Sequence, residues 1–364
     1  MAIPLAEVAL PFHSLWDLTR QWVNVRRRGK FGNFFPNEFV LEPSSRKSQG
    51  VFMEYRQMGN SGVRVSVVGL GTNRFGSPDM QQAEVNKVMD AAVETGVNFL
   101  DTANVYNDGA SETTLGHALK GRMDKFVVAT KFNFPRKTSA NSWGASRYHM
   151  MQAVEQSLRR LQSDHIDLFY CHRWDDTTPI EETLRGLDDL VRMGKVCYIG
   201  ASLYASWQLA HANVMAELRG WTRFVVLQSE YNMLNRGVER EVLPYCQAHD
   251  VGFVPYYPLA GGFLTGKYEM GKPPPPGSRG ESVKLVQNLM VERNFNLVDK
   301  LNAWAKDHGR GVNELAQAWL LAQPSVCSVI TGAKRVDHVT SNVKAADWHL
   351  TAAELKEVDG ILQG

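Results

Sequence analysis

Residues 166–202 read IDLFYCHRWDDTTPIEETLRGLDDLVRMGKVCYIGAS, and this stretch sets the architecture that we expect for the whole chain. Two short apolar runs, at 166–172 and 196–202, lie on either side of a helical pattern at 180–193. Runs that are apolar almost throughout are typical of strands buried on both faces. The stretch therefore predicts a strand, a helix and a second, parallel strand.

The same alternation extends in both directions along the chain. About eight strand-like runs are each followed by helix-like sequence, and this number favours a closed parallel barrel, the (β/α)₈ TIM barrel. The other strand-like runs are VSVVGLG (65–71), VNFLDTA (97–103), FVVATKF (126–132), FVVLQSEY (224–231), GFVPYYPL (252–259) and CSVITGA (327–333). Helical patterns include AEVNKVMDAAVET (83–95), ASRYHMMQAVEQSLRRL (145–161) and GVEREVLPYCQAH (237–249).

Sequence before the barrel predicts two further parts. Asn60, Ser61 and Gly62 separate two alternating runs, which predicts an N-terminal β-hairpin ahead of the barrel. Residues 1–52 are rich in aromatic residues and show no such alternation, so we treat them as an extension, either poorly ordered or docked on the barrel. The barrel domain is then expected to span residues 53–364.

A doubly wound sheet is the alternative fold. The glycine cluster at Gly69 and Gly71 continues into Thr72, Asn73 and Arg74, and so lacks the third glycine of the dinucleotide fingerprint. The barrel is therefore favoured. The segment 266–288, which contains four consecutive prolines, is long for a connection and is interpreted as a lid or binding loop.

Composition narrows the classes of function. The chain has 364 residues, 44% hydrophobic and 21% charged, with a net charge of +2, which excludes a disordered or fibrous protein and predicts no nucleic-acid or membrane partner. The four cysteines form no C-x-x-C pair, so we expect reduced thiols, a cytoplasmic location and no metal site. No apolar stretch approaches the length of a membrane span, about 18 residues.

Four polar residues lie at or just beyond the ends of apolar runs, where barrel enzymes place their chemistry: Asp101, Tyr106, Lys131 and His172. Each alone has a structural interpretation, as a helix cap, a wall aromatic, a surface charge or a half-buried histidine. Together they form a proton-transfer site, because a cation beside a tyrosine stabilises the phenolate. Asp101 would hold the ammonium of Lys131, and His172 would orient a substrate oxygen.

These motifs resemble the aldo-keto reductase superfamily from about Met53 to Gln363. The resemblance is carried by FLDTANVY (99–106), VVATKF (127–132) and FYCHRWDDTTPIEETL (169–184). LQSEYNMLNR (227–236) and PLAGGFLTGKY (258–268) are most similar to bacterial reductases related to potassium-channel β subunits. It implies that Asp101, Tyr106, Lys131 and His172 are catalytic and that NADPH reduces an aldehyde or ketone to an alcohol.

The resemblance also implies which residues bind NADPH. Gly71 and Thr72 would approach the cofactor, Ser202 and Gln228 would hydrogen-bond its carboxamide, and Tyr256 would stack on the nicotinamide ring. Phosphates would be bound by the long loop and by the segment ITGAKRVDHVTSNV (330–343). Three residues depart from the usual family pattern: Leu203, after Ser202, at a carboxamide contact, and His338 and Ser341 in the segment 330–343, near the adenine. The full predicted set is Gly71, Thr72, Asp101, Ser202, Gln228, Tyr256, Lys267, Arg279, Gly332, Ala333, Lys334, Arg335 and Asn342.

Substrate and partners are less constrained. Trp143, Trp174 and Tyr257 are expected near the mouth of the barrel, where they predict an apolar-walled pocket for a small carbonyl compound. The sequence is compatible with a homo-oligomer and does not determine the oligomeric state. Two other functions also stay open: an NADPH-sensing module that regulates a partner protein, and a barrel isomerase or lyase without a nicotinamide cofactor.

Overall fold

The computed structural model describes residues 53–135 and 139–363, so the predicted extension at 1–52 lies outside the described part of the chain. Eight parallel strands form one sheet in the order β10-β3-β4-β5-β6-β7-β8-β9. The strands are β3 (Val68–Gly71), β4 (Phe99–Asp101), β5 (Val127–Phe132), β6 (Ile166–Cys171), β7 (Val196–Ser202), β8 (Val226–Glu230), β9 (Gly252–Tyr256) and β10 (Val329–Gly332).

Backbone hydrogen bonds link the last strands and bring the sheet round on itself. Phe253 of β9 donates to the carbonyl of Ser325 at 2.8 Å and accepts from the amide of Cys327 at 3.0 Å, just before β10. Because β10 also pairs with β3, the eight strands form a nearly closed barrel. The predicted (β/α)₈ architecture is confirmed.

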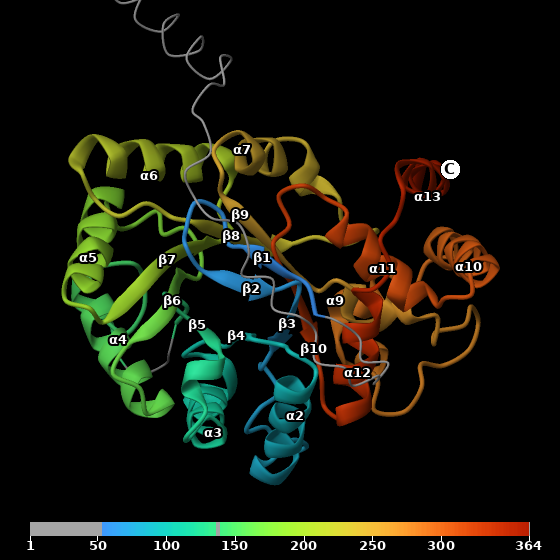
Figure 1. Ribbon diagram of the computed structural model, residues 1–364, viewed down its shortest axis with the longest axis horizontal. Coiled ribbons are helices and arrows are strands. Elements are labelled where there is room, and N and C mark those ends of the chain that lie inside the picture. The colour runs from blue at the N-terminus through green and yellow to red at the C-terminus, as the bar shows by residue number, and fades with distance from the viewer. Residues whose placement is uncertain (1–52, 136–138, 364) are drawn as a thin grey trace, which may run out of the picture. The chain divides into compact units, whose positions relative to one another are not determined.

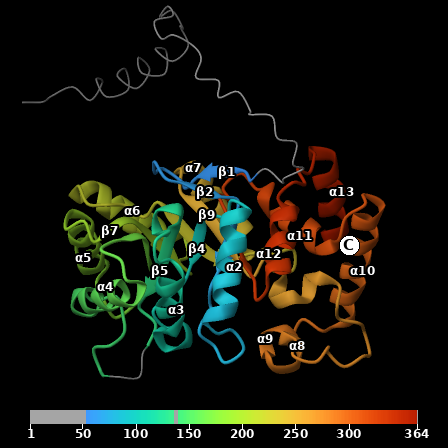
Figure 2. The same ribbon diagram turned by 60° about the horizontal axis from the view of Figure 1, so that its bottom comes forward.

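Helices surround the strands, as Figures 1 and 2 show. Their apolar faces pack on the outside of the barrel, where most of the core lies. Within the described residues, no helix is long and apolar enough to cross a membrane. The helices are α2 (Gln82–Glu94), α3 (Ala110–Ala118), α4 (Arg147–Leu161), α5 (Ile180–Arg192), α6 (Ser206–Arg219), α7 (Val242–Ala248), α8 (Arg279–Ser282), α9 (Lys284–Gln287), α10 (Glu292–Asp307), α11 (Val312–Leu321), α12 (Val336–Ala345) and α13 (Ala352–Gln363).

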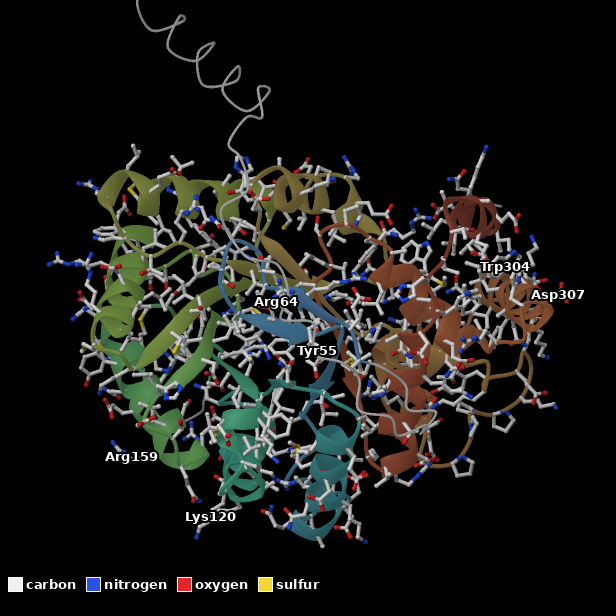
Figure 3. All side chains as sticks on the ribbon, in the orientation of Figure 1. Tyr55, Arg64, Lys120, Arg159, Trp304 and Asp307 are labelled. Carbon is white, nitrogen blue, oxygen red and sulfur yellow. The ribbon has the colours of Figure 1, made fainter. Side chains whose placement is uncertain are left out.

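A hairpin of β1 (Tyr55–Gln57) and β2 (Arg64–Ser66) covers the amino ends of the barrel strands, with Tyr55 and Arg64 over the barrel in Figure 3. Met58 and Val65 are fully buried and cluster with side chains of the barrel interior. Gly59 has a φ of +52°, and a Cβ there would lie 2.1 Å from the carbonyl oxygen of Val225. Only glycine fits this close approach. The predicted hairpin is confirmed and forms the floor of the barrel.

Two boundaries differ from the sequence interpretation. The run 65–71 divides, because Val65 and Ser66 belong to β2 and the first barrel strand begins at Val68. The segment 266–288 is not a plain loop, since it contains the short helices α8 and α9. Prolines at 273–276 keep its first half free of regular structure.

Candidate active site

Three neighbouring strands bring Asp101, Lys131 and His172 to one edge of the barrel. Asp101 is the last residue of β4, Lys131 lies one residue before the end of β5, and His172 directly follows β6. Tyr106 begins a short 3-10 turn in which Asn107 has a φ of +49°. The side-chain amide of Asn107 donates to the carbonyls of Asn73 and Phe75 in the loop after β3, and these two hydrogen bonds fix the turn.

The centre of the site is a buried ion pair. Lys131 Nζ lies 2.6 Å from Asp101 Oδ1, and the Lys131 side chain is fully buried. Lys131 Nζ also donates to the carbonyl of Thr102 at 2.8 Å and to the hydroxyl of Tyr106 at 3.3 Å. The other carboxylate oxygen, Asp101 Oδ2, accepts from Gln228 Nε2 at 2.8 Å. The ammonium is thus aimed at the Tyr106 hydroxyl.

Protonation states follow from this burial and pairing. Burial alone lowers the pKa of Lys131, but the Asp101 carboxylate and the contact with Tyr106 raise it above its usual value, so the side chain stays an ammonium. Burial raises the pKa of Tyr106, and the Lys131 charge opposes that rise. Tyr106 therefore keeps its proton at neutral pH, with a cation placed to stabilise the phenolate if the proton leaves.

His172 lies beside Tyr106, with the ring centroids 6.0 Å apart in an edge arrangement. Burial, then the charges of Lys131 and Arg173, lower the pKa of His172 well below its usual value, so the ring is neutral at pH 7. Its Nδ1 is buried and has no hydrogen-bond partner within the described structure. Phe134 packs edge-on against the ring at 4.4 Å. Sequence reasoning missed Phe134, although it closely follows the lysine strand.

The residues predicted to approach the cofactor, to bind its carboxamide or to stack on its nicotinamide ring lie at or near the carboxyl ends of their strands. Gly71 ends β3 and Ser202 ends β7 beside Gln228 of β8. Tyr256 ends β9 and is partly exposed. Thr72 is buried, and its hydroxyl donates to the carbonyl of Asp101 at 3.0 Å. The Thr72 hydroxyl and one amide hydrogen of Gln228 therefore already donate hydrogen bonds within the protein, both to Asp101.

Cations gather on the segments after β9 and β10. Burial and the charge of Arg335 lower the pKa of His338, Asp337 opposes them, and Lys267 and Lys334 lower it further. The three cations therefore act electrostatically on one histidine. Lys267 also approaches the glycine-rich turn Ala260–Thr265, where a Cβ on Gly262 would lie 3.0 Å from Lys267 Nζ. A glycine-rich backbone turn with a cation beside it fits a ligand that carries phosphates.

Two of these cations have carboxylate partners on the protein. Lys334 Nζ pairs with Asp79 Oδ2 at 2.5 Å, and Arg335 forms a two-pronged pair with Asp337 at 2.8 and 2.9 Å. Both pairs are largely exposed. Exposed pairs contribute little energy, so a phosphate is able to compete for the cations.

Other predicted residues have these positions. Gly332 ends β10, Ala333 is buried next to it, and the Asn342 amide on α12 donates to the Gly332 carbonyl at 3.4 Å. The Arg279 guanidinium stacks over Tyr257 at 5.4 Å, and Tyr257 lies against Tyr256 at 5.5 Å.

Within the described chain, no ring contact joins the predicted pocket residues Trp143 and Trp174 to Tyr256 or Tyr257. Trp143 is 37% exposed. Trp174 packs against Tyr204 and Trp207, with ring centroids at 5.2 and 5.7 Å. Trp207, a residue that sequence reasoning missed, is 62% exposed on α6. An apolar wall therefore follows β6 and β7, and Trp174 is its partly buried member.

A parallel barrel whose strand ends hold a buried ammonium, a carboxylate, a tyrosine and a neutral histidine is equipped for proton transfer. Residues 67–363 match the model of the Aldo/keto reductase family. The chain belongs to this family and is an oxidoreductase.

Individual relatives agree with this assignment. An uncharacterized oxidoreductase of Bacillus subtilis (strain 168) is 35% identical over 86% of this chain and 97% of its own length. A probable voltage-gated potassium channel subunit beta of Oryza sativa subsp. japonica is 34% identical, over 85% and 97%. The L-glyceraldehyde 3-phosphate reductase of Escherichia coli (strain K12) is 33% identical, over 84% and 92%. The predicted resemblance is confirmed.

Proposed function

We propose that this oxidoreductase reduces an aldehyde or ketone to an alcohol with NADPH, and that Tyr106 protonates the carbonyl oxygen. The carrying observation is the 3.3 Å contact between the Tyr106 hydroxyl and Lys131 Nζ, whose ammonium is paired with Asp101. NADPH, when bound, supplies the hydride. The glycine-rich turn and the cations Lys267, Arg279, Lys334 and Arg335 would hold its phosphates, and Tyr256 its nicotinamide ring.

Each of the four side chains has a defined task in this proposal. Neutral His172 donates a hydrogen bond that orients the substrate oxygen beside the Tyr106 hydroxyl. Tyr106 gives its proton to that oxygen as negative charge develops there. Lys131 stabilises the phenolate that remains, and Asp101 holds Lys131 in place. The free cysteines of the described chain suit a reducing compartment, so we place the enzyme in the cytoplasm.

The test is Tyr106→Phe, measured in two ways. A fluorescence titration should give NADPH binding near that of the wild type. Single-turnover oxidation of bound NADPH by an accepted aldehyde should slow about 10²- to 10⁴-fold, the usual contribution of a general acid. Tyr256→Phe is the matched control, because it removes a hydroxyl but keeps the ring, and it should keep the rate. A Tyr106→Phe enzyme as fast as the wild type would remove Tyr106 as the acid.

A second function is favoured by the relatives named as potassium channel β subunits. In this second function, bound NADPH controls association with a partner protein, and carbonyl reduction is not the main role of the protein. The same experiment separates the two proposals. A wild-type protein that binds NADPH but reduces no member of a broad aldehyde and ketone panel would support the sensor.

A further inference from the structure

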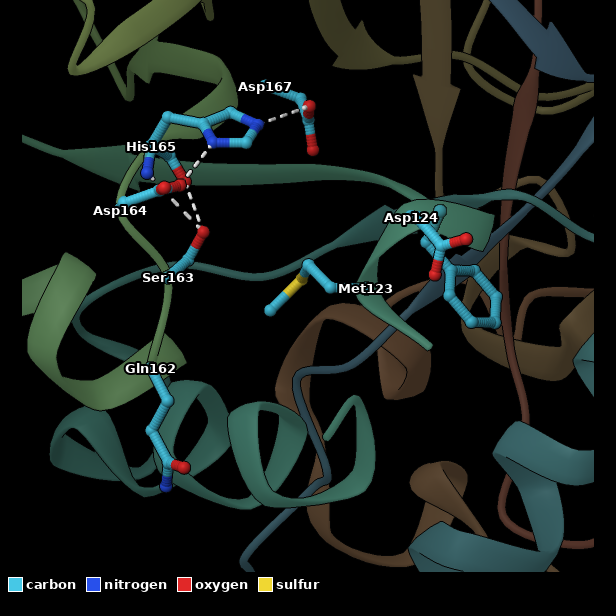
Figure 4. A pocket seen from close by; sticks show the side chains of 8 residues that line it. Met123, Asp124, Gln162, Ser163, Asp164, His165 and Asp167 are labelled. Carbon is cyan, nitrogen blue, oxygen red and sulfur yellow. Dashed lines mark hydrogen bonds and ion pairs between the residues drawn. The ribbon is translucent and has the colours of Figure 1, made fainter. Parts of the chain in front are cut away.

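A hollow of about 580 Å³ lies far from the proposed active site. It opens beside the amino ends of β5 and β6, where His165 precedes β6 and Asp167 is the second residue of that strand. The carboxyl end of β6, next to His172, is about four residues further, or roughly 13 Å. Its lining residues are Met123, Asp124, Phe126, Gln162, Ser163, Asp164, His165 and Asp167 (Figure 4).

Two lining residues of the hollow, His165 and Asp167, lie close to a third residue with a metal-binding atom, Cys197. His165, Asp167 and Cys197 offer a ring nitrogen, a carboxylate oxygen and a thiol sulfur that all lie within 4.8 Å of one another. Ile166 pairs with Val196 and Leu168 with Tyr198, so Asp167 and Cys197 stand side by side on the same face of the sheet. Cys197 is the exposed cysteine of the described chain, which gives an ion access.

The spacing suits a tetrahedral ion. His165 Nε2 and Asp167 Oδ1 are 3.5 Å apart. A tetrahedral zinc ion with nitrogen and oxygen bonds of about 2.1 Å separates two such ligands by about 3.4 Å. The sulfur needs to approach by only about 1 Å to complete three ligands. Side-chain rotation of an exposed cysteine accomplishes this.

Both oriented ligands are held in place by a second hydrogen bond. Asp164 Oδ1 lies 2.6 Å from His165 Nδ1, which directs the opposite nitrogen, Nε2, toward Asp167, as the dashed lines of Figure 4 show. The backbone amide of Val128 donates to Asp167 Oδ2 at 2.8 Å and leaves Oδ1 facing the histidine. A carboxylate behind a ligating histidine is a standard feature of zinc sites.

We propose that His165, Asp167 and Cys197 bind one zinc ion, with its fourth position open to the hollow. Nitrogen and sulfur ligands favour zinc over magnesium or calcium, which prefer oxygen. On binding, the Cys197 thiol releases its proton to water, as does His165 Nε2 where it is protonated, and the ion occupies the space between His165 and Asp167. No spacing motif predicts this site, because its ligands come from two separate β–α units.

Cobalt(II) titration of the chelator-treated full-length protein tests the proposal. Cobalt replaces zinc and gives a near-ultraviolet thiolate-to-metal charge-transfer band. We expect a band that saturates at one equivalent and disappears when zinc is added. Cys197→Ser should abolish the band, His165→Gln should weaken cobalt binding at least tenfold, and Asp164→Asn should weaken it about 10- to 100-fold. Asp124→Asn in the same hollow and His211→Gln on α6 are controls that should change nothing.

Three results would overturn the proposal: no saturable band in the wild type, a band that survives Cys197→Ser, or equal weakening by His211→Gln. A thermal melt provides a second readout. Zinc should raise the melting temperature of the wild type but not that of Cys197→Ser. Because the hollow is at the opposite end of β6 and β7 from Tyr106, Cys197→Ser should retain wild-type carbonyl reduction.

Discussion

Gln228 reaches across the barrel interior to Asp101, with its Nε2 donating to Asp101 Oδ2 at 2.8 Å. The strands that carry them, β8 and β4, stand opposite each other in the eight-stranded order. Lys131 occupies the other carboxylate oxygen. Each oxygen of this buried carboxylate therefore has its own donor, and the orientation of the Lys131 ammonium depends on a strand from the far side of the barrel.

Gln228→Leu should therefore destabilise the protein and slow it. The variant leaves Asp101 Oδ2 buried without its donor, which costs about 1–3 kcal/mol in the free energy of unfolding. The reduction rate should fall with it, because Asp101 is no longer held. Urea unfolding and single-turnover kinetics measure the two effects. A Gln228→Leu protein as stable as the wild type would show that the bond has no energetic role.

Replacing both Lys334 and Arg335 with alanine should change cofactor preference. A charge-assisted bond to phosphate contributes about 1.5–3 kcal/mol, so NADPH affinity should fall about ten- to a hundredfold more than NADH affinity. Lys344→Ala, which removes a cation in the last turn of helix α12, the helix that follows Arg335, should leave the ratio unchanged. Equal loss of both cofactors in a paired fluorescence titration would remove Lys334 and Arg335 from the 2′-phosphate site.

His172 should make the folded state sensitive to acid. Its pKa is lower in the folded protein than the usual value near 6.5, because of burial and the Lys131 charge. Below about pH 6.5 the unfolded chain therefore binds a proton that the folded chain does not, and stability falls as pH falls, by at most about 1.4 kcal/mol per pH unit. His172→Asn should flatten this dependence in urea unfolding at pH 7.5, 6.5 and 5.5. An unchanged slope would contradict a neutral, buried His172.

Gly116 should be intolerant of even one added methyl group. It lies on α3 where this helix meets α4, and a Cβ there would be 2.5 Å from the carbonyl oxygen of Arg160. Gly116→Ala should cost about 1–3 kcal/mol of unfolding free energy, because the two helices must separate. Gly360→Ala on α13 is the control: its Cβ meets nothing within 4 Å, so it should stabilise the helix by about 0.5–1 kcal/mol. Chemical unfolding compares the pair.

Much of this arrangement is predictable from sequence because parallel strands end at a common edge. Apolar runs locate the strands, so the residues that end them, Asp101, Lys131 and His172, are expected to be neighbours. The bond from Gln228 to Asp101 is not predictable in this way, since it depends on the diameter of the closed barrel. Likewise Asp79 meets Lys334 only because β3 and β10 are adjacent, although they lie at opposite ends of the domain sequence.

Because the hairpin of β1 and β2 covers one end of the barrel, the two ends of the barrel have different roles. Met58 and Val65 of the hairpin pack into the barrel interior at the amino ends of the strands. A substitution at this end should therefore lower the stability of the folded protein. The opposite rim carries the loops and the polar side chains. Changes in the loops at the carboxyl ends of the strands should therefore alter the range of substrates without changing the core that packs on the hairpin.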